Sequence, residues 1–135
     1  MDLSKRVDAE QLFTLELLDP TTDDPLGVMF KIRSAGSREA KAVLRKHGDA
    51  NLERLQKRKL LKSADAERME LEKAASYIAS WDWGPHDWKG AKPDLNMETA
   101  IEVLTEADWI FAQVVEAATD IAHFSKASVK TSPKP

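Results

Sequence analysis

The chain has 135 residues, of which 42% are apolar and 32% are charged, and its net charge is −3 at pH 7. That length suits one domain with a single core, and the composition is that of a helix-rich globular protein. The absence of cysteine excludes disulfides, thiolate metal sites and a cysteine nucleophile. No apolar run approaches the ~18 residues of a membrane span, and the N-terminus lacks the apolar stretch of a signal peptide, so we expect a cytoplasmic protein.

The net charge conceals a local imbalance. Between Arg38 and Lys62 there are nine basic residues and three acidic ones, a local charge of +6 that leaves −9 for the rest of the chain. Such a block can attract nucleic acid or an acidic protein surface. No aromatic residue lies inside it to stack on bases, as single-strand binders usually require, so a solvated helix face is the favoured interpretation. Pairing of the block with this chain's own acidic helices, or with another copy, stays open as an alternative.

The N-terminal third predicts a polar arm followed by a β-hairpin. Residues 1–10 are mostly polar, whereas residues 13–17 and 28–33 alternate between apolar and polar side chains, which is typical of strands. Residues 19–25 between them are rich in Asp, Thr and Pro, the residues that form turns. A two-stranded hairpin over residues 11–33 is marginal alone, so its apolar face should pack on helices or on a neighbouring subunit.

Helices are predicted over about residues 37–83. Ser37 is a suitable N-cap for the first of them, and Ser63 suggests a fresh start for a later one. A single helical face then carries four apolar residues: Leu71, Ala74, Ala75 and Ile78. This helix should close with two tryptophans and end near Gly84, just before Pro85.

After a loop bounded by Gly and Pro over residues 84–93, Asn96 is a good N-cap for a long helix over residues 97–124. Apolar residues recur there every three or four positions, and only Asp108 interrupts the stripe. The predicted fold is therefore α+β and mainly α-helical, an N-terminal β-hairpin packed against a small helical bundle. One globular domain should span residues 11–124, with a flexible basic C-terminal tail over 125–135.

No pattern in the sequence indicates catalysis. The three histidines are far apart, the glycines form no phosphate-binding loop, and no serine lies in a nucleophile elbow. We therefore expect no enzyme activity, no metal and no cofactor. Contact with other chains is the favoured role, and the candidate partner-binding residues are Trp81, Trp83, Trp88, Trp109, Phe111 and Val115.

The tryptophans allow two interpretations. In one, Trp81 and Trp109 fill the core while Trp83 or Trp88 covers a loop. In the other, Trp83 or Trp88 is exposed and anchors a partner, because a large rigid ring provides much contact area at a small entropic cost. Two residues apart at a helix end, Trp81 and Trp83 should point in different directions, so one should be more exposed than the other.

Taken in order, these segments resemble the tail assembly chaperones of long-tailed bacteriophages. The N-terminal segment FTLELLDPTTDDPLGV, residues 13–28, resembles the opening hairpin of that family. The segment IASWDW, residues 78–83, resembles its tryptophan before a loop. Its final helix resembles ETAIEVL, residues 98–104, and WIFAQVVEAATDIAHF, residues 109–124.

This resemblance implies a non-enzymatic protein of the infected cell that is absent from the finished virion. Such proteins bind the tape measure protein and recruit tail tube protein subunits while the tail is built, so self-association into a homo-oligomer is expected. The family often makes a longer product by a programmed ribosomal frameshift, and Ser132 to Lys134 can be encoded by a slippery heptamer. Nucleic acid and membrane partners are not expected.

Two alternatives to the chaperone remain at this point. The protein could be a structural tail or head–tail connector subunit that stays in the virion. Less favoured is a small nucleic-acid-binding regulator that uses the basic stretch from Arg54 to Lys62, whose affinity would fall steeply with salt.

Overall fold

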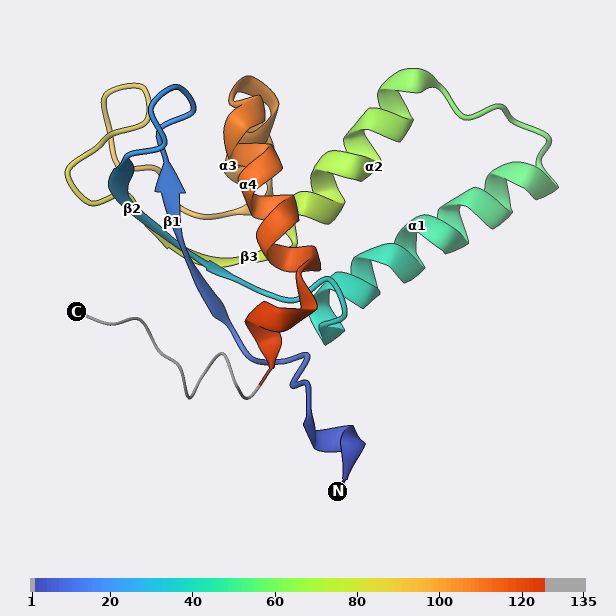
Figure 1. Ribbon diagram of the computed structural model, residues 1–135. Helices are drawn as coiled ribbons and strands as arrows, with labels where there is room; N and C mark the ends of the chain where they lie inside the picture. The colour runs from blue at the N-terminus through green and yellow to red at the C-terminus, as the bar shows by residue number, and fades with distance from the viewer. Residues whose placement is uncertain (1, 126–135) are drawn as a thin grey trace.

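The computed structural model describes residues 2–125, which form one antiparallel sheet and a set of helices (Figure 1). The strands are β1 (Phe13–Leu18), β2 (Pro25–Ile32) and β3 (Ile78–Asp82), in the order β1-β2-β3. The helices are α1 (Arg38–Gln56), α2 (Ser63–Ala75), α3 (Met97–Glu106) and α4 (Asp108–Thr119), with short 3-10 turns at Leu3–Lys5 and Ile121–Phe124. The expected mainly helical α+β fold is thus confirmed.

The predicted hairpin is confirmed as β1 and β2, which pair from Phe13 opposite Ile32 to Leu18 opposite Pro25. Its residues alternate because successive side chains on a strand point to opposite faces. Val28, Phe30 and Ile32 are buried under the helices, whereas Met29 and Lys31 between them face solvent. The hairpin therefore packs its apolar face on this chain's own helices.

The helix predicted to end at Trp81 and Trp83 is wrong in its last part. α2 stops at Ala75, and residues Ile78–Asp82 form β3, which pairs antiparallel with the second edge of β2. The prediction failed because Ile78 happens to follow Ala74 and Ala75 at a helical spacing. A strand that must pair with residues some fifty positions earlier leaves no local signal, and a third strand gives the hairpin the support that it lacks alone.

The helix predicted over residues 97–124 is broken. α3 ends at Glu106, Ala107 adopts a non-helical conformation (φ −117°, ψ 82°), and α4 starts at Asp108. Asp108, which interrupts the apolar stripe in the sequence, is thus the exposed first residue of a new helix. The apolar side chains on either side of the break are buried in one core, notably Val103, Leu104 and Val114.

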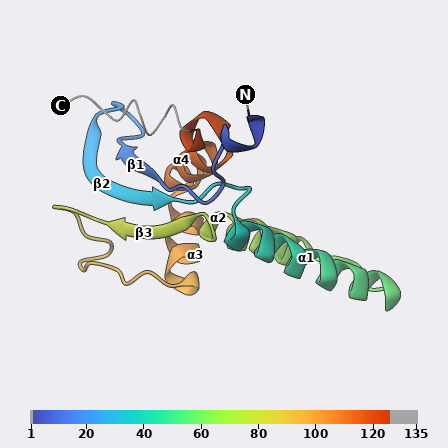
Figure 2. The same ribbon diagram turned by 90° about the horizontal axis from the view of Figure 1, so that it is seen from below.

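α1 and α2 form a helical hairpin that runs away from the sheet, as the two views in Figures 1 and 2 show. Ser37 caps α1 as predicted, because its side-chain oxygen accepts from the backbone N–H of Ala40. α2 starts at Ser63 without any side-chain cap. Of the 19 residues of α1 only Ala40 is buried, so most of this helix lies outside the core.

The N-terminal arm contacts the end of the domain. Val7 forms an isolated β-bridge with Ser125, and the backbone N–H of Asp8 donates to the carbonyl of Phe124 at 2.9 Å. Ser125, the first residue of the predicted tail, is therefore paired with the arm. The remainder of that tail, residues 126–135, lies outside the described part of the chain.

Candidate functional site

An apolar pocket of about 300 Å³ lies where the hairpin turn, the loop after β3 and the start of α4 meet. Three tryptophans line it: Trp83 and Trp88 from the loop, and Trp109 from α4. We call this the aromatic pocket. The remaining apolar wall comes from both hairpin strands and from α4, through Leu17, Leu26, Val28 and Ile110.

A contact between two glycines joins the hairpin to the loop beside this pocket. Gly27 in β2 and Gly84 after β3 both have positive φ angles, +78° and +58°. A Cβ atom on Gly84 would lie 2.3 Å from the carbonyl oxygen of Gly27, so only glycine allows this approach. The close approach brings the loop that carries Trp88 over the hairpin.

Trp83 lies at the centre of an aromatic cluster and is only 7% exposed. Its ring centroid is 5.6 Å from that of Trp81, 5.9 Å from that of Trp88 and 5.8 Å from that of Phe30. Tilted and edge-to-face pairs at such distances stabilise a fold beyond the area that they bury. These ring contacts pack one wall of the pocket, as is typical of a pre-formed binding site.

The indole N–H groups of these tryptophans have different environments. Trp81 donates to the carbonyl oxygen of Pro93 at 3.0 Å, and Trp88 donates to the carboxylate of Glu102 at 2.9 Å. The Nε1 atom of Trp83 is buried without a hydrogen-bond partner among the described residues. An unpaired buried donor costs about 1–3 kcal/mol, so packing around Trp83 must outweigh that cost.

The loop is also held to α3 by charge. Nζ of Lys89 lies 2.7 Å from a carboxylate oxygen of Glu106 and 3.7 Å from one of Glu102, and 5.9 Å from the centroid of the Trp88 ring. The hydrogen bond with Glu106 raises the pKa of Lys89, so this side chain stays protonated at neutral pH. Trp88 is thereby fixed on its α3 side and leaves one ring surface to the pocket.

The rim of the aromatic pocket is polar, with Asp19 from the hairpin turn and His86 and Asp87 from the loop. The backbone N–H groups of Thr21 and Thr22 donate to Asp19 and hold its pKa below the usual value, so Asp19 is ionised at neutral pH. Within residues 2–125, no three His, Asp or Glu side chains gather in a way that could bind a metal ion. None of the helices described combines the length and apolarity needed to cross a membrane.

The structure brings together three of the six predicted partner-binding residues, Trp83, Trp88 and Trp109. Trp81 packs on Phe30 and Trp83 away from the pocket, Phe111 lines a different groove, and Val115 packs against the core. The sequence does not reveal that the hairpin forms part of the pocket wall. The close approach of Gly84 to Gly27, which places the hairpin beside the loop, leaves no local pattern in the sequence.

The expected directions of two tryptophans need correction. One of Trp81 and Trp83 is more exposed than the other, as expected, but it is Trp81, whereas Trp83 is buried. Trp88, the alternative surface candidate, is partly exposed. Trp81 and Trp83 belong to one extended segment, in which residues two apart lie on the same face, and their rings are in contact.

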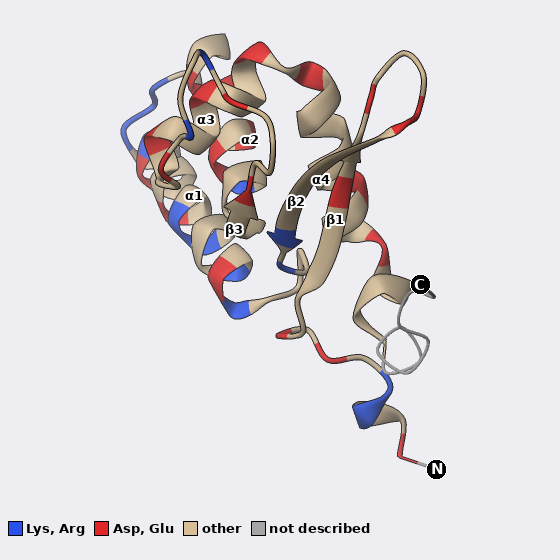
Figure 3. Cartoon of the chain, turned by 90° about the vertical axis from the view of Figure 1, so that its left-hand side faces the viewer, with Lys and Arg blue, Asp and Glu red and all other residues tan. Residues whose placement is uncertain are grey.

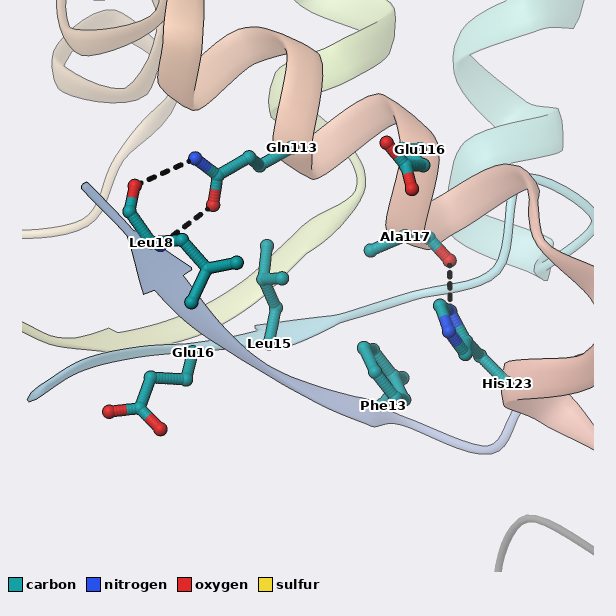
Figure 4. A pocket seen from close by; sticks show the side chains of 8 residues that line it. All are labelled: Phe13, Leu15, Glu16, Leu18, Gln113, Glu116, Ala117 and His123. Atoms are coloured by element: carbon teal, nitrogen blue, oxygen red, sulfur yellow. Dashed lines mark hydrogen bonds between the residues drawn. The ribbon is translucent and has the colours of Figure 1, made fainter. Parts of the chain in front are cut away.

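A second concavity lies between β1 and α4 (Figure 4). The side-chain amide of Gln113 hydrogen-bonds both the N–H and the C=O of Leu18, each at 2.9 Å. Next to them, the ring of His123 stacks on Phe13 at 3.7 Å and donates to the carbonyl of Ala117. β1 is a sheet edge, and Gln113 occupies the backbone groups that another strand would need there, so this concavity is a weaker candidate for a docking site.

Comparison with family models gives one decisive observation, a match of residues 32–134 to the model of the YdaY prophage protein family. The chain belongs to this family. The match includes all four tryptophans and α1 to α4, and it begins at the last residue of β2. No curated protein and no solved structure matches the chain.

Membership in the YdaY prophage family confirms the expectation of a phage protein at this coarser level. The family description carries no tail assembly role, so the aromatic pocket is the main structural indication of how this YdaY family member acts.

Proposed function

We propose that the protein is a phage tail assembly chaperone that binds the tape measure protein during tail assembly in the host cytoplasm, without catalysing a reaction. The proposal includes recruitment of tail tube protein through a longer frameshift product. Its support is the pre-formed aromatic pocket in a chain of phage origin. The residues of the frameshift prediction, Ser132 to Lys134, lie outside the described part of the chain.

The chemistry of the pocket suits an apolar partner segment with positive charge beside it. Its walls are tryptophan and aliphatic side chains, and two carboxylates lie at the rim: Asp19, and Asp87, which is 3.1 Å from Nζ of Lys92. Sites of this kind bind protein chains through a few buried anchors surrounded by polar residues. A tape measure protein is long, helical and apolar along one face, so it needs such contacts at many points to stay soluble.

The test is co-expression of the chain with a fragment of the tape measure protein from the same phage. Trp88→Ala removes a wall of the pocket, whereas Trp81→Ala is a matched control. Both residues are partly buried tryptophans with one hydrogen bond from Nε1, but the control ring lies outside the pocket. We expect the native chain and Trp81→Ala to keep the fragment soluble, and Trp88→Ala to weaken the complex at least about tenfold.

The proposed function is wrong if the fragment stays insoluble with the native chain and no complex is purified. If Trp88→Ala and Trp81→Ala bind the fragment equally, the chaperone function can still hold, but the aromatic pocket is not its binding site. Mass spectrometry of purified virions addresses the connector alternative, because a chaperone should be missing from the particle and a connector should be present in fixed copy number.

A further inference from the structure

The exposed side of α1 carries an apolar face that nothing in the described chain covers. Leu44, Leu52 and Leu55 are 47%, 60% and 72% exposed, and their spacing places them on one side of the helix. Gly48 lies between them, and a Cβ atom there would meet nothing within 4 Å. We call these three leucines the leucine face. Exposed leucines that share one side of a helix are a candidate interaction surface.

The leucine face is flanked by positive charge. Lys41 and Arg45 lie on the same side of α1, and neither forms an ion pair with another residue in the described part of the chain. α1 uses a different side for its contact with α2, where Nε2 of His47 lies 2.8 Å from a carboxylate oxygen of Glu72. The leucine face is therefore on a different side of α1 from the contact with α2.

A groove of complementary character lies between α2, α3 and α4, with a volume of about 170 Å³. We call it the acidic groove. Leu71, Leu104 and Phe111 line it with apolar surface, and Glu67, Glu70 and Asp108 add three carboxylates. Glu70 contacts Lys73 at 3.4 Å, whereas Glu67 and Asp108 form no ion pair with any described residue.

We propose that the leucine face of one copy docks into the acidic groove of a second copy. Leucines then meet the apolar surface of the groove, and Lys41 and Arg45 meet its free carboxylates. Figure 3 shows Lys and Arg along α1 with fewer acidic residues among them, and mainly Asp and Glu on the other helices. The opposite charges favour this pairing and disfavour contact between two copies of α1.

A second copy is needed because the leucine face of α1 cannot reach the acidic groove of its own molecule. The contact between His47 and Glu72 holds α1 on one side of α2, whereas the groove uses Glu67, Glu70 and Leu71 on another side. The two surfaces are different, so each copy offers one of each. Contacts of this head-to-tail kind continue into chains of copies unless the geometry closes a ring.

The test is sedimentation velocity of the full chain over a range of concentrations. We expect the native chain to associate, and Leu52→Ala with Leu55→Ala to raise the concentration for association at least about tenfold. Leu12→Ala is the control, because Leu12 is also exposed (47%) but lies before β1, outside both surfaces. Circular dichroism should show the same helix content for all of these variants.

A charge reversal separates the proposed contact from other kinds of association. Arg45→Glu and Glu67→Lys should each weaken association, and the double variant should restore it, because the reversed pair attracts again. The proposal is overturned if the native chain stays monomeric, if the leucine variant associates like the native chain, or if the double variant is no better than the single ones. The last result would indicate another occupant of the leucine face.

This experiment uses only the chain itself. A failure to associate would leave the binding of the tape measure protein through the aromatic pocket untouched, because the acidic groove and the aromatic pocket share no residue.

Discussion

At the scale of single residues, Trp83 combines the best packing in the candidate site with its one unpaired polar atom. The ring contacts three other aromatic rings, but the buried Nε1 atom has no acceptor among the described residues. Trp81, its neighbour in the cluster, has an N–H that does donate to a carbonyl. Substitutions at Trp83 and Trp81 can therefore separate the contribution of ring packing to stability from that of the indole hydrogen bond.

We expect Trp83→Phe to change the free energy of unfolding by less than Trp81→Phe. The first substitution removes an unpaired donor, whereas the second leaves the carbonyl of Pro93 without its partner, at a cost of about 1 kcal/mol or more. Trp83→Ala should cost about 3–5 kcal/mol, because it leaves a cavity in the cluster. Urea unfolding measures all three. A larger loss for Trp83→Phe than for Trp81→Phe would contradict the prediction.

At the scale of elements, two contacts determine how the parts are arranged. A hydrogen bond between His47 and Glu72 joins α1 to α2, and the approach of Gly84 to Gly27 joins the loop after β3 to the hairpin. The first orients the helical hairpin, and the second builds the aromatic pocket. Each can be tested by one substitution.

Glu72 should make stability depend on pH. Hydrogen bonds from His47 and then from Arg68 lower the pKa of its carboxyl group, against the opposing effect of burial, and Lys46 adds a favourable charge. A carboxylate with a lowered folded-state pKa stabilises the fold above its unfolded pKa, and that contribution is lost as pH falls through the folded value.

We therefore expect Glu72→Gln to lower the free energy of unfolding at pH 7 and to reduce its dependence on pH between about pH 5 and pH 3. Urea unfolding at a series of pH values measures this. Glu53→Gln is the control, because Glu53 pairs with Lys57 on an exposed part of α1, and such pairs contribute little. Equal pH profiles for the native chain and Glu72→Gln would contradict the prediction.

Gly84→Ala should destabilise the protein by about 2 kcal/mol or more, because the new Cβ atom would lie 2.3 Å from the carbonyl oxygen of Gly27. Gly90→Ala is the matched control. Gly90 also has a positive φ angle, +89°, but nothing lies within 4 Å of the added atom, so its cost is the backbone strain alone. Thermal unfolding should show the larger fall in midpoint for Gly84→Ala. Equal falls would mean that the loop moves away without cost.

At the scale of the whole molecule, α4 connects the surfaces that matter for binding. Its first turn contributes Trp109 and Ile110 to the aromatic pocket, and Asp108 and Phe111 to the acidic groove. Further along, Gln113 closes the edge of β1. The break at Ala107 sets the direction of α4. It therefore helps to position both the aromatic pocket and the acidic groove, which use different sides of this helix.

The charges are also separated at this scale. α1 runs away from the sheet and carries Lys41 and Arg45 without an ion-pair partner among the described residues, whereas the acidic groove carries Glu67 and Asp108 without one. In the proposed self-association, charges separated in this way favour one relative orientation of the copies over others. Many copies bound along a long helical partner would need a common orientation, so self-association would suit binding to the tape measure protein. Each of the two proposals can nevertheless hold without the other.

The sequence by itself determined the hairpin and the caps at Ser37 and Asn96. Each of these depends on neighbours within a few residues, such as the alternation in β1 and β2 or a side-chain oxygen that accepts from Ala40 or Thr99. The mainly helical α+β class followed from the same local patterns. The structure places three of the aromatic candidates, Trp83, Trp88 and Trp109, at one pocket, and their role in binding a partner stays a prediction.

Only the tertiary structure decided the third strand, the break at Ala107 and the shape of the pocket. β3 forms because β2 offers a free edge, and Ala107 leaves the helix although alanine favours helices, because α3 and α4 must both bury their apolar sides. The pocket needs the hairpin turn beside a loop that follows some sixty residues later. Contacts over such distances in the chain depend on packing, which no short stretch of sequence contains.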